Sequence, residues 1–466
     1  MTLAYKDKEL QILREAVDKA QEISAKKLVQ SETVKNIIKI LENFIIEKKC
    51  VCYGGTAINN ILPAKDQFYN KELEIPDYDF FSDNALEHAK ELANIYYDNG
   101  YSEVEAKAGM HHGTYKVFVN FIPVADITQL SKELFKAISK EAIKVKNILY
   151  APPNYLRMAM YLELSRPKGD VSRWEKVLKR LILLNKHYPI RNKNCDSLTF
   201  MRDFENIDID IDKKNNIYNI TKNAIIDEGL VFFGGYAISL YGKYMPKKII
   251  KQISNIPDFD VLSTEPKQSA IIISQRLKKA GLNSQIIQRP GIGEIIAPHY
   301  EISIDKDTIV FIYEPLACHS YNTIKIHNRI IKVATIDTML SFYLAFLYAN
   351  RPYYDNNRLL CMAQYLFQVQ AKNRLEQKGL LKRFSLNCYG EQQTLENIRA
   401  EKTEKFKELK KNKNSKEYEE WFLRYLPTEL NYTNKNKKQT KKQTKKQTKK
   451  QTKKVNKKLK KEYWNL

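Results

Sequence analysis

The 466-residue sequence has no long hydrophobic run. A membrane-spanning helix needs about 20 mostly apolar residues in a row, and no stretch of this chain approaches that length. The N-terminus, Met1-Thr2-Leu3-Ala4-Tyr5-Lys6-Asp7-Lys8, also lacks the pattern of a secretory signal peptide. We therefore expect a soluble protein that does not act at a membrane.

Cysteine is scarce and scattered. The chain has 6 cysteines: Cys50, Cys52, Cys195, Cys318, Cys361 and Cys388. Several lie in apolar surroundings, which predicts free thiols in a reducing cytoplasm and not a disulfide framework. Cys50-x-Cys52 has no second ligand pair nearby, and His111-His112 stands alone, so a structural zinc site is not expected.

Acidic residues are also few relative to basic ones. The chain has 54 Asp and Glu against 78 Lys and Arg, a formal net charge of +24. Much of the excess lies near the C-terminus, where Lys437 to Thr452 is four copies of Lys-Lys-Gln-Thr. Such a segment is too polar and too strongly like-charged to build a core, so we expect residues 431–466 to be disordered when free. It serves either as a solvated or localisation tail or, as we favour, as an arm that binds phosphates.

A hydrophobic content of 43% over this length predicts two or three domains. An amphipathic helix is expected before the strand Cys50–Tyr53, because apolar residues recur there at helical spacing: Val34, Ile37, Ile38, Leu41, Phe44 and Ile45. Asp208-x-Asp210-x-Asp212 begins like a calcium loop but lacks the required Gly and Glu, so it is interpreted as a strand or linker.

The most informative motif follows that strand. Gly54-Gly55-Thr56 closes it and opens an expected helix, a layout in which the backbone can approach a triphosphate and the N–H groups of the helix can face it. Asp77 and Asp79 then lie at positions i and i+2 of a strand, on one face, while Tyr78 points to the core. Asp126 ends a later strand. Three carboxylates in this arrangement predict a site for Mg²⁺ or Mn²⁺.

The motifs recur about 180 residues later. Phe233-Gly234-Gly235-Tyr236-Ala237-Ile238 repeats the glycine motif, and Asp258-Phe259-Asp260 repeats the carboxylate pair. This period is too long for a solenoid and indicates a duplicated domain. Leu316-Ala317-Cys318 stands where the first copy has Val124-Ala125-Asp126, and a thiol does not replace a carboxylate for Mg²⁺. We therefore expect the first copy to be catalytic and the second to be degenerate.

These motifs, together with Gly169-Asp170-Val171-Ser172-Arg173-Trp174-x-Lys176, resemble the poly(A) polymerase catalytic subunits of large cytoplasmic DNA viruses, of the poxvirus, African swine fever and mimivirus type. The resemblance covers residues 30 to 390. It implies an α/β (α+β) fold of tandem polymerase-β-like nucleotidyltransferase modules with helical segments. It also implies two Mg²⁺ ions, ATP as donor and an RNA 3′ end as acceptor.

The resemblance assigns roles to single residues. Asp77, Asp79 and Asp126 would be the catalytic metal ligands, and Gly54, Gly55 and Thr56 would cradle the ATP phosphates; Thr56 stands where the wider superfamily has Ser. Arg173 and Lys176 share a helix face with Arg180 and would contact the triphosphate.

We expect five segments: a catalytic module with N-terminal helices at 1–190, a linker at 191–218, the degenerate module at 219–390, helices at 391–430 and the tail. Further expectations are a homodimer, because the chain is rich in tyrosine, and a location in the host cytoplasm at viral factories or in the virion. Two alternatives stay open at this point. One is a nucleotidyltransferase of other specificity, making uridylyl tails or cyclic dinucleotides; the other is a non-catalytic RNA-binding or processivity subunit.

Overall fold

The computed structural model describes residues 3–70, 72–192, 195, 210–245, 258–293 and 295–427. They form two compact units, each of which is described by itself. The first unit combines Met1–Lys48, Lys71–Gln129 and Glu404–Leu466; the second combines Lys49–Asn70 and Leu130–Thr403. The five segments expected from the sequence are each continuous in the chain, and their boundaries stay a prediction. The Lys-rich segment 431–466 and Asp208 lie outside the described residues.

The sheet of the first unit has the strand order β16-β3-β4-β5-β2. β2 runs parallel to β5, and the other neighbours are antiparallel. The elements of this unit are α1 (Leu3–Val29), α2 (Glu32–Lys48), β2 (Tyr78–Ser82), α4 (Ala85–Asp98), β3 (Val104–Ala108), β4 (Thr114–Val119), β5 (Ile122–Gln129), α15 (Lys416–Phe422) and β16 (Arg424–Tyr425). α14 (Leu395–Leu409) spans the boundary between the units.

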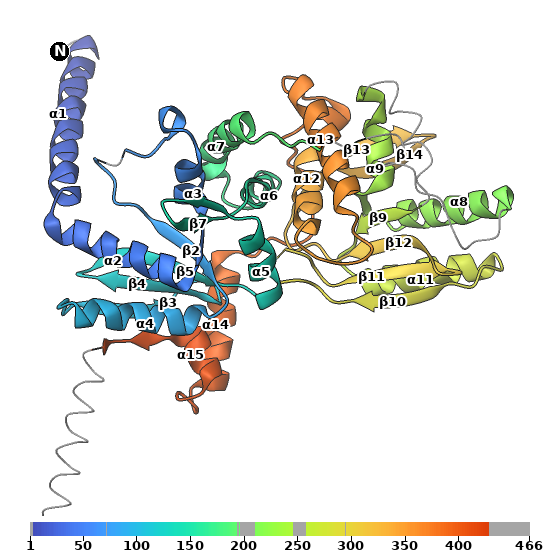
Figure 1. Cartoon of the computed structure of the whole chain (residues 1–466). Helices are drawn as coiled ribbons and strands as arrows, with labels where there is room; N and C mark the ends of the chain where they lie inside the picture. Colours follow the sequence, from blue (N-terminus) through green and yellow to red (C-terminus); the bar gives the residue numbers. More distant parts are fainter. Residues whose placement is uncertain are drawn as a thin grey trace, which may run out of the picture. The chain divides into compact units, whose positions relative to one another are not determined.

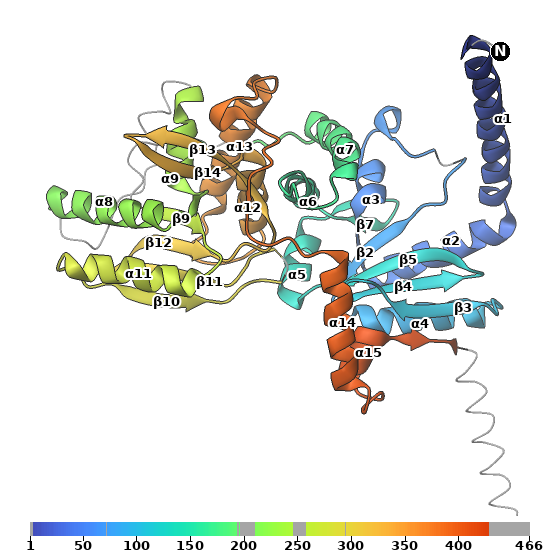
Figure 2. The same ribbon diagram turned by 180° about the vertical axis from the view of Figure 1, so that it is seen from behind.

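One face of this sheet is apolar because alternate residues of a strand point to the same side. In β4, Tyr115, Val117 and Val119 are buried while the residues between them are half-buried. α2 and α4 lie along this face (Figures 1 and 2). The amphipathic helix expected before the first strand is confirmed as α2, which buries Val34, Ile37, Leu41, Phe44 and Ile45.

The second unit begins with β1 (Val51–Tyr53), which leads directly into α3 (Gly54–Ile61). β1 pairs in parallel with β7 (Ile148–Tyr150), which pairs with β6 (Ile143–Val145). Four further elements complete this part: a 3₁₀ turn, η1 (Ala64–Asp66), α5 (Lys132–Lys140), α6 (Pro153–Leu164) and α7 (Trp174–His187).

The same unit holds a sheet of eight strands in the order β10-β11-β12-β9-β8-β14-β13-β15. Its strands are β8 (Val231–Phe232), β9 (Phe259–Leu262), β10 (Gln285–Arg289), β11 (His299–Ile304), β12 (Asp307–Tyr313), β13 (His319–Ile326), β14 (Arg329–Ala334) and β15 (Cys388–Tyr389). Its helices are α8 (Ile211–Asp227), α9 (Gly235–Tyr241), α11 (Pro266–Lys279), α12 (Ile336–Phe346) and α13 (Asn356–Lys372).

The strand pairings confirm the duplication. β2 pairs in parallel with β5, which continues through antiparallel β4 and β3; β9 pairs in parallel with β12, which continues through antiparallel β11 and β10. The hairpin β6–β7 pairs with β1 just as the hairpin β13–β14 pairs with β8. The chain therefore contains two α/β modules of the same connectivity.

Two expectations need correction. Four of the cysteines are not free thiols: Cys195 bonds to Cys361 and Cys318 to Cys388, while Cys50 and Cys52 are unbridged and buried. The acidic stretch around residue 210 is not a strand or linker throughout. Asp210 is the N-cap of α8, and its side chain accepts a hydrogen bond from the backbone N–H of Asp212, which satisfies a free donor of the first turn.

In the part of the chain that the structure describes, we find no helix of the length and apolarity that a membrane span requires.

Candidate functional site

Two of the predicted metal ligands lie directly opposite each other. Asp79 of β2 is the register partner of Asp126 of β5, so both side chains project from the same face of the sheet. Tyr78 is buried on the opposite face, as expected. The neighbouring pair, Phe80 and Ile127, is fully buried there and fixes this register. Asp77 is exposed and immediately precedes the strand.

A lysine accompanies this pair. Lys116 of β4 is the register partner of Asp126 on its other side, and its Nζ forms an ion pair with Asp126 Oδ2. The sequence interpretation did not include Lys116. Its spacing to Asp126 becomes informative only once β4 and β5 are known to be paired.

The carboxylates fit a divalent ion by their chemistry. They supply hard oxygen donors, and Asp126 pairs with the ammonium of Lys116, which a metal ion would have to displace or share. Among the described residues, no three His, Cys, Asp or Glu side chains converge closely enough to form a closed metal cage.

The glycine turn is built for close approach. Gly54 has φ +70°, a left-handed conformation that favours glycine, and α3 starts at this residue. A Cβ on Gly55 would lie 2.3 Å from Tyr69 Oη and 2.9 Å from Arg180 Nη1. Thr56 is buried in the first turn of the helix. The backbone N–H groups of this turn lie at the positive end of the helix dipole, where an anion is stabilised.

Arg180 is the basic side chain that α7 brings to this turn. Its Nη2 donates a hydrogen bond to Tyr69 Oη at 2.8 Å, and its guanidinium lies 4.9 Å from the ring centroid of Phe68. Arg173 instead forms an ion pair with Glu163, and Lys176 is exposed. The sequence placed Arg173, Lys176 and Arg180 on one helix face but predicted triphosphate contact only for Arg173 and Lys176. In the structure, Arg180 is the one of the three that reaches the glycine turn.

α7 is fastened to the segment after α3 by Asp66. Asp66 accepts hydrogen bonds from Lys186 Nζ and pairs with His187 Nε2 at 2.6 Å. These contacts, that of Lys186 above all and then that of His187, lower the pKa of the Asp66 carboxyl below its ordinary value. The ion pairs at the end of α7 thus help to hold Arg180 over the turn.

The second module has no third carboxylate at the equivalent position, but the residue that stands there is not the one expected from the sequence. Asp260 of β9 is the register partner of Phe311 in β12, so Phe311 occupies the position that Asp126 has in the first module. Cys318 is not the equivalent residue. It follows the end of β12 and is bonded to Cys388. A phenyl ring offers no ligand to a metal, so the expectation of a degenerate second module rests on Phe311.

Aromatic side chains fill this second centre. A cavity of about 40 Å³ remains, lined among others by Gly235, Asp260, Phe311, Tyr353 and Tyr354. The Asp260 carboxylate lies directly against Gly234, where a Cβ would come within 1.8 Å of Oδ2. This cavity is far smaller than the about 300–1,000 Å³ of typical small-molecule sites.

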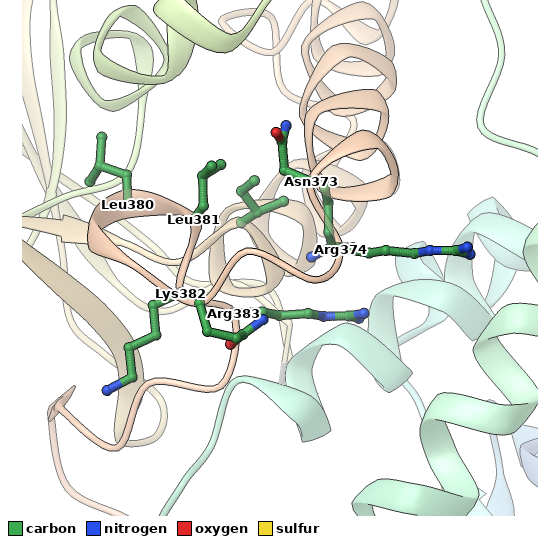
Figure 3. A pocket seen from close by; sticks show the side chains of 9 residues that line it. Asn373, Arg374, Leu380, Leu381, Lys382 and Arg383 are labelled. Carbon is green, nitrogen blue, oxygen red and sulfur yellow. The ribbon is translucent and has the colours of Figure 1, made fainter.

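Another pocket of the second unit lies after α13 (Figure 3). Its Arg383 points toward the same side as Arg374, but the guanidinium is held by the Asp337 carboxylate, which it meets through Nε and Nη2 at 2.8–3.1 Å. Gln370 also donates to Asp337. The cavity measures about 10 Å³. We interpret it as a buried ion pair that ties the loop to α12 and not as a ligand site.

Comparison with known proteins finds a family match that includes the glycine motif and the carboxylates of the first module. Residues 39–170 match the family described as poly(A) polymerase catalytic subunit. The chain is 34% identical over 180 residues to a putative poly(A) polymerase catalytic subunit of African swine fever virus (isolate Tick/Malawi/Lil 20-1/1983), covering 37% of this chain and 38% of the relative. It is 31% identical over 191 residues to that of Acanthamoeba polyphaga mimivirus, covering 40% and 32%.

The described fold is similar to the crystal structure of the Megavirus polyadenylate synthase. The TM-score is 0.73 at 22% sequence identity, over 88% of this chain and 84% of that chain. The resemblance drawn from the motifs is thus confirmed over residues 39–170, and the α/β fold of two modules is confirmed by the similar solved structure. The sequence alignments span only about a third of the length of the viral relatives, 38% and 32% of them.

Proposed function

We propose that this protein is a template-independent poly(A) polymerase that adds AMP from ATP to RNA 3′ ends. The observation that carries the proposal is the register pair Asp79 and Asp126, with Asp77 two residues before Asp79. The family match over residues 39–170 supports the choice of adenylate as product. Such a protein would act on viral mRNA, and we place it in the host cytoplasm, at viral factories or in virions.

The chemistry needs no nucleophilic side chain. The RNA 3′-hydroxyl releases its proton to solvent and its oxygen attacks the α-phosphorus of ATP. The new P–O bond forms as the bond from the α-phosphorus to the bridging oxygen breaks, and pyrophosphate leaves with the electrons of that bond. Asp77, Asp79 and Asp126 would hold Mg²⁺ or Mn²⁺ ions, which when bound supply Lewis-acid activation and charge neutralisation. Gly54, Gly55 and Thr56 would donate backbone hydrogen bonds to the β and γ phosphates, and Arg180 would add a charged donor.

The direct test is primer extension. A labelled RNA primer is incubated with each of the four nucleoside triphosphates in Mg²⁺, and we expect long products with ATP alone. Long products with UTP, or formation of cyclic dinucleotides without a primer, would indicate a nucleotidyltransferase of other specificity. Tight RNA binding with no product from any nucleotide would indicate a non-catalytic RNA-binding or processivity subunit.

Arg180→Gln should raise the KM for ATP about tenfold. A charged hydrogen bond to a phosphate is lost, and the expected ~1.4 kcal/mol falls mainly on nucleotide binding. The matched control is Lys179→Gln. Lys179 immediately precedes Arg180 on α7, forms an ion pair with Glu175 of the same helix and is 72% exposed. Steady-state kinetics with saturating primer measures the effect. Equal KM values in both variants would remove Arg180 from the nucleotide site.

We also propose that the Lys-rich segment 431–466 binds RNA phosphates. Truncation after Thr433 should weaken primer binding at physiological salt and flatten the slope of log affinity against log salt, because fewer counterions are released. Filter binding over a salt series measures this slope. A slope equal to that of the full chain would assign the segment to solubility or localisation.

The partners of the proposed enzyme are an RNA 3′ end and ATP. The homodimer expected from the tyrosine-rich composition remains part of the proposal, and sedimentation of the purified chain tests it.

A further inference from the structure

A row of charged residues crosses the sheet of the first unit. Arg424 of β16 is opposite Lys107 of β3, Lys107 is opposite Lys116 of β4, and Lys116 is opposite Asp126, which faces Asp79. Directly opposed residues of neighbouring strands project from the same face. With strands about 4.8 Å apart, the row covers about 19 Å of sheet.

Side-chain contacts confirm that these residues share one face. Lys116 Nζ is ion-paired with Asp126, Lys107 Nζ lies 3.3 Å from Glu105 Oε2, and Arg424 Nε lies 3.5 Å from Glu105 Oε1. The side chains are accessible: Lys116 is 38%, Lys107 43% and Arg424 75% exposed. The opposite face of the same strands is the apolar one that α2 and α4 cover.

This arrangement is not what stability alone would select. Like charges directly opposite each other on neighbouring strands destabilise a sheet, and Lys107 and Lys116 are such a pair. One carboxylate, Glu105, lies near both Lys107 and Arg424. The row contains three cationic side chains and ends at two carboxylates. Such a row can bind the phosphates of a polyanion and place its end at those carboxylates.

An aromatic side chain completes the surface. Lys107 Nζ lies 4.0 Å from the ring centroid of Phe118, a half-buried residue of β4 two positions after Lys116. Aromatic rings beside cations are common at sequence-independent binding sites for single strands, where bases stack on the rings. The surface fits RNA backbone with an unpaired base.

We propose that Arg424, Lys107 and Lys116 form a phosphate track for the RNA primer, which leads its 3′ end to Asp126 and Asp79. Phe118 supplies a stacking surface beside the track. The inference rests on the proposed function for the direction of the strand, and it adds where the acceptor binds. Glu105, which lies beside Lys107 and Arg424, repels phosphate and lowers the affinity of the track.

The test is binding of a fluorescent single-stranded RNA to the full chain in EDTA without ATP, over a salt series. One phosphate contact on a single strand contributes about 0.7 to the log–log salt slope, which is about fivefold in affinity at 0.1 M salt. Lys107→Gln and Arg424→Gln should each show this loss, and Lys107→Arg should keep the slope. Glu105→Gln should bind RNA more tightly, a gain that a purely structural role does not predict.

The control is Lys19→Gln, an exposed lysine of α1 outside the row that changes the net charge equally. If Lys107→Gln binds RNA like Lys19→Gln, the track is wrong. A raised KM for ATP in Lys107→Gln with unchanged RNA affinity would also overturn it, because the row would then serve the triphosphate. The binding assay contains no ATP, so the inference stands even if the wild-type protein fails to transfer adenylate. If the wild-type protein transfers adenylate but the salt slope of Lys107→Gln is unchanged, the inference is wrong and the proposed function stands.

Discussion

Asp79→Ala is expected to abolish adenylate transfer, with a fall in rate of about four orders of magnitude, or ~5.5 kcal/mol of transition-state stabilisation. Asp79 shares the register with Asp126, so its loss removes an oxygen donor from the centre of the proposed metal site. The same result is expected for Asp77→Ala. Incorporation of labelled AMP into an RNA primer measures the effect.

The duplicated module provides a matched control. Asp260→Ala removes the corresponding carboxylate of β9, which faces Phe311, and transfer should stay close to the wild-type rate. Thermal unfolding of both variants separates chemistry from folding. If Asp260→Ala were inactive and Asp79→Ala active, the catalytic centre would belong to the second module.

Asp126→Asn should lower turnover about a thousandfold, ~4 kcal/mol, while ATP binding changes little. In the proposed mechanism Asp77 and Asp79 would still hold the ion that accompanies the nucleotide, whereas the site of the ion that would activate the RNA 3′-oxygen would lose a ligand. The fold should tolerate the change, because the ion pair with Lys116 is partly exposed and such pairs contribute about 0–1 kcal/mol.

Single-turnover kinetics with saturating ATP and primer isolates the chemical step of this variant. Equilibrium binding of ATP is measured in parallel. Near-normal turnover in Asp126→Asn would contradict the role of this carboxylate, and a loss confined to ATP affinity would move Asp126 to the nucleotide ion.

Local patterns predicted much of the fold. The helical spacing of Val34, Ile37 and Leu41 identified α2, and the glycine motif located the turn into α3, because each depends on residues close in the chain. The recurrence of Gly234-Gly235 and Asp260 revealed the duplication for the same reason. The two modules share one connectivity, as a duplication requires, but the strand order itself came from the structure.

Strand register could not be predicted in the same way. The tripeptide ending at Cys318 resembles the one ending at Asp126, but hydrogen bonding between β9 and β12 aligns Phe311 with Asp260. Register depends on which apolar residues face the core after the strands pair. Similar residues at a similar spacing in the sequence do not determine it.

Contacts between distant segments were also missed. Arg180 meets Tyr69 across more than a hundred residues, and Cys195 is bonded to Cys361 at a sequence separation of 166. Lys116 could have been assigned to the site from the pairing of β4 with β5 alone, but the sequence did not specify this pairing. No periodicity encodes such contacts, since they follow from tertiary packing.

The aromatic filling around Phe311 makes the loss of the second centre hard to reverse in evolution. Phe311 is 3% exposed and packs near Tyr353, His299 and Tyr313, with ring centroids 5.3, 5.8 and 6.1 Å away. A single mutation back to aspartate would bury a carboxylate among these rings, at a cost of several kcal/mol until the neighbours also changed. Restoring a carboxylate opposite Asp260 therefore requires several coordinated substitutions among these aromatic neighbours and not one.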